Sequence, residues 1–212
     1  MIFIGDVHTK FEYLNKFKNK NLIQVGDFGY WPEIIDFKNI KFNSNIYFCD
    51  GNHENHWELK KLWHKRTETK IIENVFYMPR LSYKNIEGYN ILFIGGAESI
   101  DKNRRTIGFD WFPEETISYN DMLEENLPQQ KIDIIVSHTC PLFCFKIMNI
   151  DQKLNDPSCI WLQEIYSIYK PKYWYFGHFH FYKKFQYENC TFTCLNMVND
   201  FTNGWHEEFK GE

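Results

Sequence analysis

The sequence lacks any long hydrophobic run. No stretch of its 212 residues approaches the roughly 18 unbroken apolar residues of a membrane span. The first residues, MIFIGDVH, also lack the basic segment and apolar core of a secretory signal peptide. Repeats, low-complexity tracts and flexible linkers are missing as well, and the length suits one compact domain. We therefore expect a cytoplasmic, single-domain protein without membrane contacts.

Excess positive charge is absent. The formal net charge is −4, which argues against tight non-specific binding of nucleic acid, because such binding needs a basic surface. An enzyme that reaches a nucleic acid through a local basic pocket remains compatible with this charge. Without a secretory signal, the six cysteines are weak evidence for disulfides. We interpret them as reduced structural thiols rather than as a zinc site.

Short apolar runs alternate with helical stretches along the chain, which is typical of a layered α/β domain. The runs at 75–78, 81–86 and 91–94 are expected to form a second sheet, and the last two predicted strands a closing hairpin. Helices are predicted at 54–65 and 158–169. The remaining predicted strands are 2–4, 22–25, 46–49, 132–136, 173–176, 181–187 and 191–195.

Five of these strands end in short turns that carry Asp, Asn or His. Ligands of α/β sheets bind beyond the carboxyl ends of the strands, so the five turns are expected to converge on one site. Asp6 and His8 are two residues apart, as are His178 and His180, and extended backbone directs such pairs to one face. The blocks are Gly5-Asp6-Val7-His8, Gly26-Asp27-Phe28-Gly29, Gly51-Asn52-His53-Glu54, Ser137-His138 and Gly177-His178-Phe179-His180.

Carboxylate and imidazole ligands together suit Mn, Fe, Zn or Ni. Each block alone is more often a structural turn, but the ordered series of blocks is not explained that way. Seven ligands are too many for one ion and suit two ions that share a bridge and clamp a phosphoryl group. We predict two divalent metal ions, with Mn favoured. The seven ligands are Asp6, His8, Asp27, Asn52, His138, His178 and His180.

The series resembles the signature of the calcineurin-like metallophosphoesterase superfamily, in particular its small bacterial and phage members. That signature is D-x-H, then G-D, G-N-H-[DE], a lone H and G-H-x-H, and the match runs from Asp6 to His180. The resemblance implies an α/β fold with a two-sheet β-sandwich flanked by helices, as one metallophosphoesterase domain over residues 1–212.

The resemblance also implies a role for each site residue. Asp27 would bridge the two metals, and His53 would bind neither. Instead, His53 would lie beside the substrate phosphate and protonate the leaving oxygen or stabilise the transition state. The first metal would be bound by Asp6, His8, Asp27 and His180, and the second by Asp27, Asn52, His138 and His178.

The second block departs from the protein Ser/Thr phosphatase pattern G-D-x-x-D-R-G. Tyr30 replaces the Asp that orients the catalytic His, and Trp31 replaces the phosphate-binding Arg. Both changes disfavour a protein phosphatase. They leave open which group orients His53, because the neighbouring Glu54 can point away.

Residues 98–115 resemble an insertion found in small bacterial and phage members. The segment carries Arg104 and Arg105, and either guanidinium can supply the missing paired hydrogen bonds to phosphate. We expect one of them, with Arg105 favoured, to face the metals while the other pairs with acidic neighbours. Trp111 or Phe112 would pack the loop down or stack on a substrate ring. A solvated charged loop is the alternative.

We therefore expect a dinuclear metal-dependent phosphoester hydrolase that uses a metal-bridging hydroxide. A phosphodiesterase acting on nucleotides or nucleic acid is slightly favoured, because the phosphatase Arg is missing. A phosphomonoesterase acting on small molecules or proteins is the alternative. Outside enzymes, the alternative is a metal-binding scaffold, which the presence of His53 and of every ligand disfavours.

Overall fold

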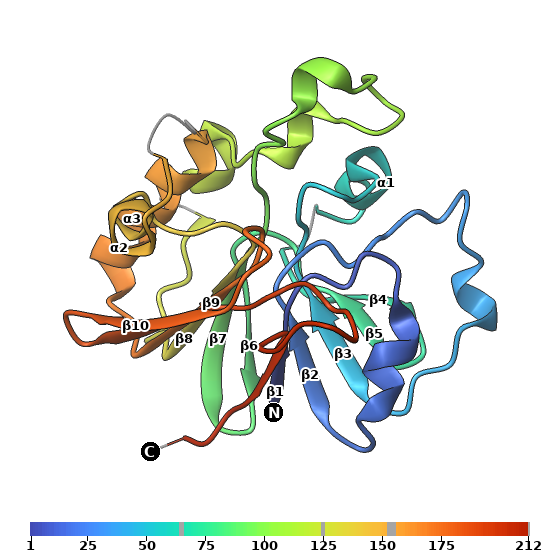
Figure 1. Ribbon diagram of the computed structural model, residues 1–212, viewed down its shortest axis with the longest axis horizontal. Helices are drawn as coiled ribbons and strands as arrows, with labels where there is room; N and C mark the ends of the chain where they lie inside the picture. Colours follow the sequence, from blue (N-terminus) through green and yellow to red (C-terminus); the bar gives the residue numbers. More distant parts are fainter. Residues whose placement is uncertain (64–65, 124–125, 152–155, 212) are drawn as a thin grey trace.

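The computed structural model describes residues 1–63, 66–123, 126–151 and 156–211 (Figure 1). Within these residues, two six-stranded sheets face each other. The first sheet has the order β12-β1-β2-β3-β5-β4, with four parallel central strands between antiparallel edge strands β12 and β4. Its strands are β1 (Ile2–Ile4), β2 (Asn21–Gln24), β3 (Asn45–Phe48), β4 (Thr69–Ile72), β5 (Val75–Tyr77) and β12 (His206–Glu208).

The second sheet has the order β10-β11-β9-β8-β7-β6. Here too the four central strands are parallel, and the edge strands β10 and β6 are antiparallel. Its strands are β6 (Ser82–Ile86), β7 (Tyr89–Ile94), β8 (Ile134–Ser137), β9 (Tyr173–Phe176), β10 (Lys183–Tyr187) and β11 (Cys190–Cys194). The helices are α1 (His56–Lys60), α2 (Phe143–Met148) and α3 (Pro157–Tyr169), with 3₁₀ helices η1 (Phe11–Lys16), η2 (Phe37–Asn39), η4 (Lys102–Arg104), η5 (Pro113–Glu115) and η6 (Tyr119–Met122).

Apolar side chains from both sheets fill the space between them. In β1, Phe3 points inward and stacks on Tyr175 of β9, with ring centroids 3.6 Å apart and planes 3° apart. Ile2 and Ile4 pack on the other face, in a cluster with η1, because alternate strand residues point to opposite sides. The helices α2 and α3 cover the outer face of the second sheet. This arrangement confirms the expected sandwich flanked by helices.

Two predictions about the elements were wrong. The strand at 75–78 is β5, and it belongs to the first sheet, where Val75 pairs with Ile46 of β3. An apolar run does not reveal which of two sheets it joins. The helix predicted at 54–65 is shorter, and residues 64–65 lie outside the described part. Glu54 precedes α1 because its side chain bonds elsewhere, and Asn55 instead caps the helix by accepting from the Glu58 amide.

All six cysteines are buried, and none of them is joined in a disulfide. Across the described ranges, every helix is too short or too polar to cross a bilayer.

Arg80 lies where the chain passes from the first sheet to the second, and it is only 3% exposed. Its guanidinium donates two hydrogen bonds to Asp50 Oδ2, at 3.0 and 2.7 Å. It also donates to the carbonyls of Glu114, Glu115 and Thr116 at 2.7–3.0 Å. Burial opposes ionisation of Asp50, but the charge of Arg80 prevails and lowers the pKa of that carboxyl. The buried pair therefore ties the end of β3 to the segment that crosses above it.

We expect Arg80→Met to lower the free energy of unfolding by about 3–5 kcal/mol, because it leaves the Asp50 carboxylate buried without its partner. Since the pKa of Asp50 is depressed in the folded wild type, the stability from this group is present at neutral pH and is lost as the pH falls into the acid range. The difference in the free energy of unfolding between the variant and the wild type should therefore become smaller below about pH 4. Urea unfolding at several pH values measures it.

Lys61→Met is the matched control, because Lys61 is exposed and its pair with Glu58 lies at the surface. Surface pairs contribute about 0–1 kcal/mol. An Arg80→Met protein as stable as this control at neutral pH would contradict the role assigned to Arg80.

Candidate metal centre

The five turns identified in the sequence lie at the carboxyl ends of five strands. Asp6 and His8 follow β1, Asp27 follows β2, and Asn52 and His53 follow β3 in the first sheet. His138 follows β8, and His178 and His180 follow β9 in the second sheet. Because the parallel strands of both sheets end on the same side, the two sets of side chains meet across the top of the sandwich, on the side away from the N-terminus (Figure 1).

Four of these residues form a first donor cluster: Asp6, His8, Asp27 and His180. Each offers one ligand atom, and these atoms lie within 4.8 Å of one another. Nε2 of His180 lies 3.2 Å from Nε2 of His8 and 3.2 Å from Asp6 Oδ2. Nε2 of His8 is 3.6 Å from Asp27 Oδ2.

A second donor cluster is formed by Asp27, Asn52, His138 and His178. Nε2 of His138 lies 3.3 Å from Asp27 Oδ1 and 3.1 Å from Asn52 Oδ1. Nδ1 of His178 lies 3.0 Å from the same amide oxygen. Asp27 therefore contacts the first donor cluster with one carboxylate oxygen and the second with the other.

The donor atoms fit bound cations better than they fit one another. The Nε2 atoms of His8 and His180 face each other, although a pair of neutral rings can share only one proton there. Oδ1 of Asp6 is buried and has no hydrogen-bond partner among the described residues. An unpaired buried carboxylate oxygen is costly. A cation in the first donor cluster would satisfy both, and a mixture of carboxylate, imidazole and amide donors suits transition metals.

The backbone at these residues is not extended, which corrects the sequence argument. His8, Asp27, His178 and His180 all have positive φ angles, between 46° and 69°. Such conformations are unusual without glycine and cost of order 1–3 kcal/mol each, so the surrounding structure must hold them. Turns past the strand ends, rather than strand alternation, direct these side chains to one centre.

Two glycines permit the close approach of the carboxylates. A Cβ atom on Gly51 would meet the side chain and the backbone nitrogen of Asp27. A Cβ atom on Gly177 would meet Oδ1 of Asp6. The Gly-Asn-His and Gly-His blocks therefore need glycine because a carboxylate from another strand end, on the same sheet for Gly51 and on the facing sheet for Gly177, occupies the space beside it.

The charges of the ion-free site are unevenly distributed. Burial alone would lower the pKa of His138, but the carboxylate of Asp27 beside it raises it to about 10. Burial and the neighbouring His138 lower the pKa of His178 to about 3. Although burial opposes it, the His138 charge also holds the pKa of Asp27 well below its usual range. A proton on His138 thus neutralises Asp27, in the place where a cation would do so.

His53 stands beside both donor clusters. Its ring centroid is 5.0 Å from that of His8, and its Nε2 lies 3.4 Å from Nη2 of Arg105. Burial lowers the pKa of His53, and the charges of His8 and Arg105 lower it further, against the opposing effect of Asp27. The ring of His53 therefore lies between the first donor cluster and Arg105 and belongs to neither donor cluster.

The main chain of His53 is fixed by Asp27 and by Trp31, the residue that stands where the phosphatase pattern has its arginine. Its amide donates to Asp27 Oδ1 at 2.8 Å, and its carbonyl accepts from Trp31 Nε1 at 3.1 Å. Glu54 points away from the ring, because its carboxylate accepts the amides of Phe28, Gly29 and Tyr30 at 2.8–3.0 Å. Glu54 therefore holds the turn that carries Asp27.

Residues 98–115 cross above α1, on the side of the site (Figure 1). Arg105 reaches His53, and its Nε pairs with Asp101 at 2.7 Å. Arg104 is exposed. We expected the arginine that turned away to pair with acidic neighbours, but the pair with Asp101 is made by Arg105. Phe112 packs the segment down, since its ring lies 5.3 Å from that of Trp57 and is 1% exposed.

Sequence reasoning missed the support of Asn52. The Asn52 amide nitrogen donates to Ser99 Oγ at 3.1 Å, and that hydroxyl donates to Glu115 Oε2 at 2.9 Å. Trp111 Nε1 donates to the other oxygen of Glu115 at 2.9 Å. Asn52, Ser99 and Glu115 are all buried, and burial raises the pKa of Glu115 to about 7. Because its nitrogen is held by Ser99, Asn52 directs its oxygen toward His138 and His178.

Paired carboxylate and imidazole clusters at the strand ends of two facing sheets define a metal-dependent phosphoesterase. The chain belongs to the calcineurin-like phosphoesterase family, whose model matches residues 1–182. Membership implies phosphorylated substrates and two divalent metal ions, and the first donor cluster offers a possible metal site.

The fold is also similar to that of a solved structure, the phosphopantetheinyl hydrolase PptH from Mycobacterium tuberculosis. The TM-score is 0.54 and the sequence identity is 16%, with 100% of this chain and 95% of that chain covered. At 16% identity, the similarity between the two structures supports the assignment of the fold alone. No curated protein matches the chain in sequence.

We expect Ser99→Ala to weaken binding of one of two Mn ions by roughly 10- to 100-fold, because the Asn52 amide would lose the group that fixes its orientation. Calorimetric titration of the ion-free protein measures the stoichiometry and both affinities. The control is Ser167→Ala, since Ser167 is exposed on α3 and bonds only within its own helix among the contacts described. Unchanged affinities in Ser99→Ala would show that Asn52 needs no support from Ser99.

Proposed function

We propose that this phosphoesterase uses two divalent cations to hydrolyse phosphodiesters of nucleotides or nucleic acid, with Mn favoured. The observation that carries the proposal is the position of Asp27, whose two oxygens face the two donor clusters. In this proposal, the first donor cluster (Asp6, His8, Asp27, His180) and the second (Asp27, Asn52, His138, His178) each hold one cation.

When bound, the two cations act as Lewis acids on the phosphoryl oxygens and on the attacking water. His53 donates the proton from Nε2 to the leaving oxygen. Its pKa is low in the free site, but an anionic phosphate between His53 and Arg105 raises it toward the protonated form. Arg105 donates hydrogen bonds to a phosphoryl oxygen, in the role of the arginine that Trp31 replaces.

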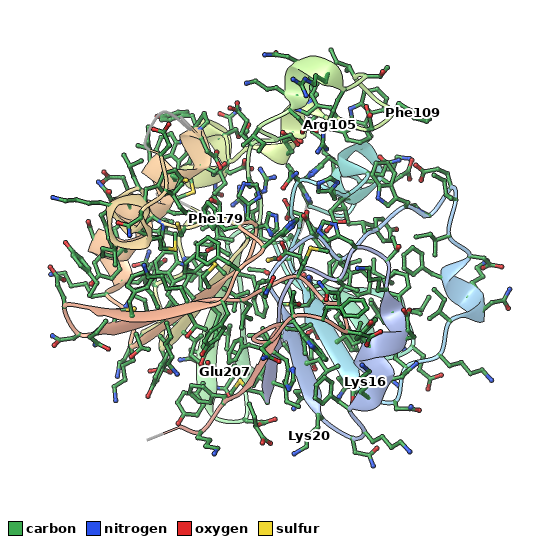
Figure 2. All side chains as sticks on the ribbon, in the orientation of Figure 1. Lys16, Lys20, Arg105, Phe109, Phe179 and Glu207 are labelled. Carbon is green, nitrogen blue, oxygen red and sulfur yellow. The ribbon has the colours of Figure 1, made fainter. Side chains whose placement is uncertain are left out.

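Two cavities lie near the site, one lined by a donor-cluster residue and one next to the turn that carries His8, and they favour a diester over a monoester. One, of about 860 Å³, is lined by Thr9, which follows His8, and by Trp31. The other, of about 240 Å³, is lined by His178 and Phe179. A diester presents two organic substituents at phosphorus, whereas a monoester presents one. Figure 2 shows Phe179 well separated from Phe109, which lines the larger cavity.

A turnover screen with added Mn tests the proposal. The substrates are mononucleotides, cyclic nucleotides, dinucleoside monophosphates, oligonucleotides and phosphopeptides. We expect a diester to be the best substrate, and hydrolysis to stop on chelation and return with Mn. Full activity with metal shown absent would rule out the two-cation mechanism. A phosphopeptide or mononucleotide monoester as best substrate would instead establish the phosphomonoesterase alternative.

On the best substrate, we expect His53→Ala to keep both cations and lose roughly 10²- to 10⁴-fold in kcat, the usual contribution of general acid catalysis. His178→Ala is its counterpart, because His178 belongs to the second donor cluster. That variant should bind fewer cations. Elemental analysis beside rate measurement separates the two effects. A metal-depleted His53→Ala protein would mean that His53 is a ligand.

A further inference from the structure

Two residues of the larger cavity's wall are hydrogen-bonded to His53 and to Arg105, which do not themselves line it. Trp31 lines it and donates its indole N–H to the His53 carbonyl. Asp110 lines it as well, and its carbonyl accepts from Nη1 of Arg105 at 3.2 Å. Nη2 of the same Arg105 is the group 3.4 Å from His53 Nε2. The cavity wall is therefore bonded to the main chain of His53 on one side and to the guanidinium of Arg105 on the other.

The lining of this cavity is apolar and aromatic. One wall is formed by Ile34, Ile35 and Ile40. Phe109, which Figure 2 labels, belongs to segment 98–115 and lines the cavity from there. Phe109 is 74% exposed and Ile34 is 77% exposed. Large side chains left exposed around a concave site mark a surface that a ligand covers. The volume of about 860 Å³ lies within the range of small-molecule sites.

The charges of the lining have one sign. Glu33 and Asp110 belong to it, and its described lining includes no cationic side chain. Both carboxylates are held in place, Glu33 by the Asn55 side chain and Asp110 by the amide of Thr106. A ligand with a further phosphate group would place that anion beside two fixed carboxylates. An uncharged ligand with an aromatic ring would meet no such repulsion.

We propose that this cavity binds the leaving alcohol of the substrate, and that this alcohol is uncharged and carries an aromatic ring, as a nucleoside does. The inference rests on the proposed function, in which His53 protonates the leaving oxygen, and on the bond that joins the cavity wall at Trp31 to the main chain of His53. Phe109 and Trp31 supply ring faces for stacking, while Glu33 and Asp110 exclude a second phosphate. The preferred substrate is then a short diester that ends in a nucleoside, and not an internal bond of a nucleic acid chain.

Three related diesters test the inference with the Mn-loaded wild-type protein. ApA has an uncharged nucleoside on each side of its phosphate, and pApA and ApAp add a terminal phosphate at one end or the other. Product analysis of ApA identifies the leaving nucleoside. A phosphate on that nucleoside should lower kcat/KM about tenfold or more. Equal kcat/KM with and without that phosphate would overturn the proposal.

Variants assign the selectivity to the cavity. Phe109→Ala should lower kcat/KM for ApA roughly 5- to 100-fold, mainly through KM, because a base–aromatic stack is lost. Phe201→Ala is the matched control, since Phe201 is 99% exposed and is not part of the cavity lining. Replacing Glu33→Gln and Asp110→Asn together should raise the ratio of kcat/KM for the phosphorylated diester to kcat/KM for ApA. Wild-type kcat/KM for ApA in Phe109→Ala would overturn the proposal.

Failure of the proposed function is distinguishable from failure of this inference. If no phosphoester is hydrolysed by protein that holds two Mn ions, the proposed function is wrong. Calorimetric titration of the same protein with adenosine still tests the cavity, because it needs no turnover. Adenosine binding that Phe109→Ala weakens and Phe201→Ala does not weaken supports the cavity, and its absence refutes it.

Discussion

The site depends on the carboxylate of Asp27, which is held in a buried position where water cannot solvate it. The backbone of Asp27 is in the left-handed region. The turn that begins at Asp27 is fixed by hydrogen bonds from three backbone amides to the side chain of Glu54. Gly51 leaves room for the Asp27 carboxylate, and His53 donates its amide to it. Each of these features supports a buried negative charge that lies between the two donor clusters.

The chemistry of the site was readable in the sequence because it is local. Every donor lies just beyond a strand end, so the apolar runs predicted a layered α/β domain with the donors at one site, and the order of the short motifs carried the resemblance that implied the two-sheet sandwich. The supporting residues were not readable. Ser99 meets Asn52 and Arg80 meets Asp50 only through the fold, and a serine or an arginine outside any motif gives no sign of burial. The sheet that β5 joins was hidden for the same reason.

Segment 98–115 connects these two kinds of information. The middle of the segment carries Arg105 and Phe109 on the open side of the site. The two ends carry Ser99 and Glu115, which form the buried support of Asn52. Arg80 fixes the carbonyl of Glu115, so the segment that shapes the substrate cavity is anchored on the sandwich core. The proposed substrate cavity and the support of Asn52 thus share one stretch of chain.

The pairing of β1 has a consequence for biosynthesis. One neighbour of β1 is β12, and the turn that carries Asp6 is bonded to the same late part of the chain, through the amides of Gly5 and Val198. A growing polypeptide leaves the ribosome with its first strand long before these partners exist. The turn that carries Asp6 therefore reaches its full set of contacts only after residues 198–208 have been synthesised, and a nascent chain that stops before β12 would expose one edge of β1.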